Sequence, residues 1–119
     1  MAKIVVSITC AKDNPDKATV AMVIANAALV SGQEAIVFLS TEGVRLGVKG
    51  YVDDIREEGF APMKELLTSF LENGGIMWVC TPCFKKRKYA EGDLVEGAKL
   101  VGGATLVEAL SQGAACVGY

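Results

Sequence analysis

Short apolar runs alternate with amphipathic stretches along the 119 residues of the chain. The apolar runs are nearly uninterrupted, as in strands that are covered on both faces, and comprise residues 3–9, 34–40, 76–80, 98–101 and 115–117. The stretches between them have helical character and comprise residues 15–30, 62–72, 81–89 and 105–112. Strands that alternate with helices predict an α/β fold with a parallel sheet between two helical layers.

Capping residues mark the ends of several of these helices. Asn14 or Asp13, followed by Pro15, predicts the start of the first helix, and Thr81 followed by a proline predicts the start of a short third helix. Residues 105–108 form a capping-box pattern, which predicts that the last helix begins at Thr105. The apolar face expected on the first helix consists of Val20, Val23, Ile24, Ala27 and Ala28.

The connection from residue 41 to residue 61 is long for a compact domain, and we expect only short helical turns in it, near 44–46 and 52–57. Long connections of this kind usually carry function or an interface. We expect residues 1–119 to form a single domain, because one domain usually takes about 100–150 residues.

The composition narrows the class of function. Twelve basic and fourteen acidic residues give a net charge of −2, so direct nucleic-acid binding is not expected. The chain has no histidine, which excludes Ser–His–Asp and Cys–His catalytic pairs and zinc sites that need imidazole. No cofactor and no metal are expected. No targeting segment or membrane span is visible, so we expect a cytoplasmic protein whose four cysteines are reduced.

The strongest chemical signal is the Cys80-Thr81-Pro82-Cys83 sequence at a predicted strand-to-helix junction. Ligands of parallel α/β sheets gather at the carboxyl ends of the strands, where Cys80 is expected to lie. A helix N-terminus and the basic run at 85–88 both favour the thiolate. We therefore expect a pKa for Cys80 below the unperturbed cysteine value of about 8.5.

Three further residues are candidates for contacts with a substrate beside this cysteine pair: Cys10, Thr81 and Lys85. Cys10 follows the first strand at the same edge of the sheet and is either a second reactive thiol or a packed residue. The run at 85–88 is either a solvated helix face or a patch for an anion. Cys116 lies within the last predicted strand and is expected to be buried.

Zinc binding and thioredoxin-like chemistry, the two commonest uses of a CxxC pair, fit this chain less well. A structural zinc site needs four ligands, and the sequence has neither a second CxxC pair nor a histidine. Thioredoxin-like disulfide exchange also uses a CxPC motif at a helix N-terminus. In that fold the motif follows an early strand and a second proline lies downstream, whereas here the motif follows the third strand and Pro82 is the last proline.

The order and spacing of four segments resemble the DsrE/DsrF-like family, and within it the YchN-like proteins. These segments are the opening strand and helix leading to residues 33–39, the turn at 41–44, the cysteine pair at Cys80 and Cys83, and the closing strand and helix at 97–100 and 105–110. The resemblance implies a three-layer α/β/α sandwich with a largely parallel five-stranded sheet. It also implies homo-oligomers, often trimers or hexamers, or hetero-oligomers with paralogues.

In members of that family with assigned roles, the cysteine at the position of Cys80 accepts sulfane sulfur as a persulfide and passes it on. The resemblance therefore implies a small sulfur-relay protein, a possible sulfurtransferase, whose partners are sulfur donor and acceptor proteins. Cys83 would then serve as a resolving thiol or a second acceptor. Thiol–disulfide exchange at the pair, and an oligomeric binding subunit without catalysis, remain the alternatives.

Overall fold

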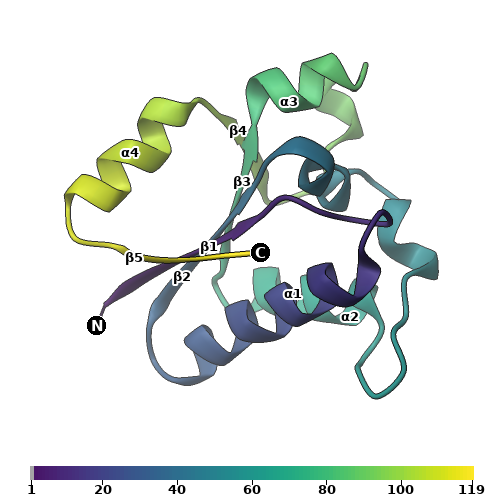
Figure 1. Ribbon diagram of the computed structural model, residues 1–119, viewed down its shortest axis with the longest axis horizontal. Helices are drawn as coiled ribbons and strands as arrows, with labels where there is room; N and C mark the ends of the chain where they lie inside the picture. Colours follow the sequence, from purple (N-terminus) through teal and green to yellow (C-terminus); the bar gives the residue numbers. More distant parts are fainter. Residues whose placement is uncertain (1) are drawn as a thin grey trace.

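One five-stranded sheet organises the computed structural model, which describes residues 2–119. All neighbouring strands pair in parallel, in the order β4-β3-β2-β1-β5 (Figure 1). The strands are β1 (Lys3–Ile8), β2 (Glu34–Leu39), β3 (Ile76–Cys80), β4 (Ala98–Val101) and β5 (Ala115–Gly118). Because every pair is parallel, all five strands end at the same edge of the sheet.

Helices cover both faces of this sheet. α1 (Pro15–Val30) and α2 (Met63–Glu72) lie side by side on one face, and α4 (Gly103–Ser111) lies on the other (Figure 1). The short α3 (Thr81–Lys86) stands at the carboxyl end of β3. The predicted α/β/α sandwich with a largely parallel five-stranded sheet is therefore confirmed, and the sheet is parallel throughout.

The long connection after β2 contains two 3₁₀ turns, η1 (Thr41–Gly47) and η2 (Tyr51–Asp54), close to where short helical turns were predicted. A third 3₁₀ turn, η3 (Glu91–Asp93), precedes β4. Most of η1 is buried and packs against β2, β3 and α3. The connection therefore places the buried turn η1 against β3 and α3, at the edge of the sheet where the cysteine pair lies.

The predicted start of α1 is confirmed, but its predicted buried face is wrong. Asn14 caps the helix by accepting a hydrogen bond from the backbone N–H of Lys17 at 3.2 Å, and Pro15 is the first helical residue. The residues that are buried against the sheet are instead Ala18, Thr19, Ala21, Met22 and Ala25. Small side chains allow the helix to approach the strands closely, whereas Ile24 is 37% exposed.

The predicted starts of α3 and α4 are displaced. Thr81 is the first residue of α3 rather than its cap, and the helix ends at Lys86, before Lys88, which adopts a positive φ of 67°. α4 begins at Gly103, with Gly102 at the N-cap position, so Thr105 lies inside the first turn. Its backbone N–H donates to the Gly102 carbonyl at 3.1 Å. Backbone hydrogen bonding thus begins these helices before the side-chain caps that the sequence suggested.

Candidate functional site

Cys80 lies at the junction of β3 and α3, as the sequence predicted. It is the last residue of the strand and occupies the N-cap position of the helix, with an extended backbone (φ −63°, ψ 115°). Its side chain is half-buried and packs beside the residues of the sheet face that α4 covers. Phe84, one turn further along α3, is fully buried and anchors the helix to the core. A rigid strand end and a buried aromatic ring therefore fix the position of this thiol.

Cys83 lies in the first turn of α3, directly beside Cys80. Cys83 acts on the Cys80 thiol through its backbone N–H and through its own thiol, so the two residues are close neighbours. Both cysteines are free thiols and both are half-buried. The structure therefore places the two cysteines of the predicted pair side by side, one at the end of β3 and the other in the first turn of α3.

The predicted acidity of Cys80 is wrong in sign. Burial raises the pKa of the Cys80 thiol above its ordinary value, and the neighbouring thiol of Cys83 raises it further. The Cys83 backbone N–H and the charge of Arg87 act in the opposite direction but do not outweigh these two effects. A helix of six residues offers few aligned peptide dipoles, and Lys85, Lys86 and Lys88 are exposed to solvent.

The three residues predicted beside the pair have different surroundings. The hydroxyl of Thr81 donates to the carbonyl of Val101 at 2.9 Å, so it joins α3 to β4. Lys85 is exposed on α3. Cys10 is only 5% exposed and follows β1, which β2 separates from β3. Burial raises the pKa of the Cys10 thiol, and the charge of Asp13 raises it further.

Cys116 is exposed, which corrects the prediction that it is buried. All four residues of β5 are exposed, because the strand lies at the edge of the sheet and the helices leave it uncovered. The apolar composition of this strand predicted its conformation but not its surroundings. Val117, on the same strand, is 37% exposed.

The sequence pattern gave no sign of an ion-pair network that connects α3 to η1. Glu42 accepts a hydrogen bond from Arg45 at 2.8 Å and another from Arg87 at 2.6 Å. Arg87 also donates to the carbonyl of Cys83 at 3.1 Å, and only 14% of its side chain is exposed. Arginine within a run of lysines is the signal that could have identified this residue, because its forked guanidinium can serve two acceptors at once.

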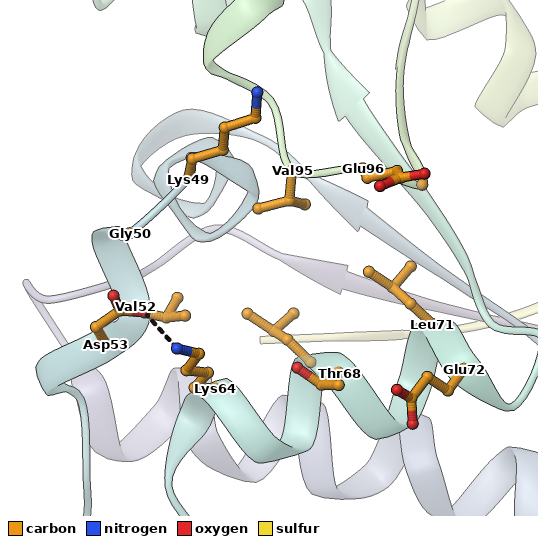
Figure 2. Close-up of a pocket in the computed structure, with 12 residues that line it drawn as sticks. Lys49, Gly50, Val52, Asp53, Lys64, Thr68, Leu71, Glu72, Val95 and Glu96 are labelled. Carbon is orange, nitrogen blue, oxygen red and sulfur yellow. Dashed lines mark ion pairs between the residues drawn. The ribbon is translucent and has the colours of Figure 1, made fainter.

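A cavity lies away from the cysteine pair, between η2, α2 and the segment before β4. It has a volume of about 760 Å³ and an apolar floor that includes Val52 and Val95 (Figure 2). Lys64 faces Asp53 across one end at 3.9 Å, and Lys49 donates to a backbone carbonyl. The charged side chains at its rim are exposed, so this groove has no buried polar group that would orient a ligand.

Two negative findings apply to the part of the chain that the structure describes, residues 2–119. No three cysteine, aspartate or glutamate side chains converge there in a way that could hold a metal ion. Within the same residues, no helix combines the length and the apolar character needed to cross a bilayer.

Comparison with solved structures shows the same fold in two proteins. The YchN protein from E. coli superposes with a TM-score of 0.75 at 15% identity, with 100% of both chains covered. A protein of unknown function from Methanobacterium thermoautotrophicum superposes with a TM-score of 0.74 at 16% identity, again over both whole chains. At these identities the likeness concerns the fold.

Sequence comparison extends the likeness to closer relatives. An uncharacterised protein of Methanopyrus kandleri is 37% identical over 97 residues, which cover 82% of this chain and 77% of that protein. An uncharacterised protein of Methanocaldococcus jannaschii is 37% identical over 98 residues, which cover 82% of each chain. The profile of the DsrE/DsrF-like family matches residues 2–118, nearly the whole sequence. This chain therefore belongs to the DsrE/DsrF-like family.

Proposed function

We propose that this protein is a cytoplasmic sulfur carrier that holds sulfane sulfur as a persulfide on Cys80. The observation that carries the proposal is the half-buried thiol of Cys80 at the end of β3 and the N-cap position of α3, with Cys83 in the first turn of that helix. Membership of a family associated with sulfur relay supports it. The four free cysteines fit a reducing compartment.

The proposed loading step is a thiolate exchange and needs no added oxidant. The Cys80 thiolate attacks the outer sulfur of a persulfide on the donor protein. A new S–S bond forms to Cys80, the S–S bond within the donor breaks, and the donor cysteine leaves as a thiolate. Reaction with an acceptor thiolate reverses the roles. This chemistry needs no histidine, and the chain has none.

Cys83 provides a second outcome for the loaded sulfur. Its thiolate attacks the Cys80 sulfur of the persulfide, an intramolecular disulfide forms, and hydrosulfide leaves. The two cysteines lose two electrons, and the sulfane sulfur gains them. The proximity of the two cysteines at the start of α3 favours this step, and it equally supports thiol–disulfide exchange as the second candidate function.

Intact-protein mass spectrometry after incubation with polysulfide, followed by peptide mapping, tests the carrier. We expect a gain of about 32 Da, one sulfur atom, on Cys80 and its loss in Cys80→Ser. Cys83→Ser should retain the adduct for longer, since it removes the intramolecular attack. Cys116→Ser is the matched control because Cys116 is an exposed cysteine far along the sheet from the pair, and it should load normally.

The result that contradicts the carrier is equally specific. If Cys80 gains no sulfur while the protein rapidly reduces insulin disulfides, disulfide exchange is the function. If Cys80→Ser changes neither property and leaves the oligomer intact, the protein is a binding subunit without thiol chemistry.

The proposal includes self-association into a homo-oligomer, of three or six copies by resemblance to the family, and exchange with donor and acceptor proteins. Apolar side chains on α4 and β5 support self-association: on α4 Val107 is 64% exposed and Leu110 is 36% exposed, and on β5 Val117 is 37% exposed. Exposed apolar surface of this kind commonly marks an interface between proteins. Light scattering at micromolar concentration tests this part, and a monomer would contradict it.

A further inference from the structure

A carboxylate from the neighbouring strand end reaches the helix that carries the cysteine pair. Glu42 is the second residue of η1, which follows β2, and β2 pairs with β3 in the sheet. One carboxylate oxygen accepts from Arg45 and the other accepts from Arg87, at 2.8 and 2.6 Å. The two oxygens thus serve two different arginines, so the carboxylate is fixed in its orientation.

Arg87 connects Glu42 to the cysteine pair by donating hydrogen bonds to both. Its Nε donates to Glu42, and its Nη1 donates to the carbonyl oxygen of Cys83. This carbonyl lies near the C-terminal end of α3, where helical carbonyl groups need partners from outside the helix. The charge of Arg87 also offsets a small part of the effect of burial, which raises the pKa of the Cys80 thiol. One guanidinium therefore supports the backbone of one cysteine and stabilises the thiolate of the other.

The backbone that presents Glu42 is held tightly on both sides. Thr41 adopts a positive φ of 49°, which is costly for a β-branched residue, and its hydroxyl donates to the Thr9 carbonyl at 2.7 Å. Gly43 lies so close to β1 that an added Cβ would overlap the carbonyl oxygen of Ile8. Strain of this kind persists only where the surrounding structure fixes the conformation.

A hydrogen bond from Arg45 to Tyr89, which follows α3, stabilises the same group of ion-paired residues. Arg45 donates from Nη1 to the hydroxyl of Tyr89 at 2.7 Å. The ring of Tyr89 stacks on the buried ring of Phe84, with centroids 5.2 Å apart. The residues that hold Glu42 are thus themselves anchored in the core.

We propose that Glu42 is a positioning residue for the Cys80–Cys83 pair, and that it acts by holding the guanidinium of Arg87 against α3. The proposal deepens the proposed function and rests on it for its biological meaning, whereas the geometry and its test concern thiol reactivity alone. Lysine in place of Arg87 would keep the charge but could not donate to Glu42 and to the Cys83 carbonyl together.

Four variants separate this role from general stabilisation. The rate of alkylation of Cys80 by iodoacetamide is measured against pH by peptide mapping in wild type, Glu42→Ala, Glu42→Gln, Arg87→Ala and the double alanine variant. For Glu42→Ala we expect the midpoint to rise by roughly 0.5 pH unit, the size expected for one partly screened charge that moves away. At pH 7 the alkylation should slow by about twofold, since a more basic thiolate is also more nucleophilic.

The other variants show whether the effect passes through Arg87. Arg87→Ala should raise the midpoint at least as much, and adding Glu42→Ala to it should change nothing further. Glu42→Gln keeps one acceptor oxygen and should restore part of the wild-type midpoint. Lys86→Ala removes the same charge from an exposed position on α3 and should leave the midpoint unchanged.

Thermal unfolding of every variant accompanies the alkylation profiles. The proposal is overturned if Glu42→Ala lowers the melting temperature while the Cys80 midpoint stays at the wild-type value, because Glu42 would then only stabilise the fold. Additive shifts in the double variant would also overturn it. Persulfide loading is measured separately. A shifted midpoint in a protein that never accepts sulfur would contradict the proposed function and leave the positioning role intact.

Discussion

Gly43→Ala is expected to be among the most damaging single-methyl additions to this fold. Gly43 is buried in η1, and a Cβ at this position would overlap the carbonyl oxygen of Ile8. It would also lie 2.8 Å from the carbonyl carbon of Ile8 and 3.3 Å from Cα of Thr9. All three atoms belong to the backbone of the last residue of β1 or the residue after it, so no side-chain rotation can relieve the overlap.

The size of the effect follows from the cost of overpacking. Inserting a methyl group into a well-packed region typically costs about 1–3 kcal/mol, and backbone neighbours place Gly43→Ala near the upper end, at about 3 kcal/mol. For a chain of 119 residues, each kcal/mol lowers the melting temperature by about 4 °C. We therefore expect a drop of about 12 °C. Because Glu42 is the adjacent residue, the alkylation of Cys80 should slow as well.

Calorimetry and urea unfolding measure the change, with Gly92→Ala as the matched control. Gly92 has no atom within 4 Å of an added Cβ and does not adopt a positive φ, so its substitution should stay within about 0.5 kcal/mol of wild type. A melting temperature for Gly43→Ala as close to wild type as that of Gly92→Ala would contradict the expected overlap with the β1 backbone. It would mean that η1 does not press against β1 as described.

Further predictions concern the reactivity of the thiols, one hydrogen bond and the loss of stability at acid pH. Because its pKa is raised, Cys80 should be alkylated faster as pH increases and should show no plateau below pH about 8.5. Ellman's reagent should modify exposed Cys116 first and buried Cys10 only when the protein unfolds. Rapid modification of Cys10 in the folded protein would contradict its burial. Thr81→Val removes the hydroxyl that donates to the Val101 carbonyl of β4 and should lower the free energy of unfolding in urea by about 1 kcal/mol. An unchanged urea midpoint would mean that this hydrogen bond does not stabilise the fold. Arg87 and Arg45 lower the pKa of Glu42, so its stabilising contribution is present above the unfolded pKa of about 4.3 and is lost as pH falls through the lowered folded value. The free energy of unfolding should therefore fall less steeply with decreasing pH in Glu42→Gln than in wild type. The same pH dependence in both proteins would contradict the pairing of Glu42 with the two arginines.

The strands and their order of appearance could be predicted because each leaves a short apolar run of strand length that is bounded by turn or helix-capping residues. The start of α1 was equally readable, since Asn14 and Pro15 each act on the backbone within one turn. These features depend on interactions between residues close in sequence. The junction at Cys80 belongs with them, because strand and helix meet within two residues.

The failures concern properties that depend on distant residues. α1 is apolar around most of its circumference, so its pattern could not show that Ala21 would face the sheet and Ile24 the solvent. Cys116 lies in a strand whose sequence resembles a central one, yet the topology places that strand at an edge. The partner of Arg87 is Glu42, 45 positions away, and no local pattern relates the two.

The raised pKa of Cys80, which contradicted the sequence prediction, has a consequence for the proposed relay. A more basic thiolate is the stronger nucleophile but the poorer leaving group. Once ionised, Cys80 therefore takes sulfur from a donor more readily than it surrenders it, although the raised pKa also lowers the fraction of thiolate at neutral pH. Release then depends on the groups that stabilise the departing thiolate, the backbone N–H of Cys83 and the charge of Arg87. A carrier built in this way keeps its sulfur until a partner with a strongly nucleophilic thiolate arrives. Accordingly, at a pH above the pKa of Cys80, where the thiol is already ionised, variants that displace Arg87 should slow unloading to an acceptor thiol more than loading, and equal slowing of both half-reactions would contradict this division of roles.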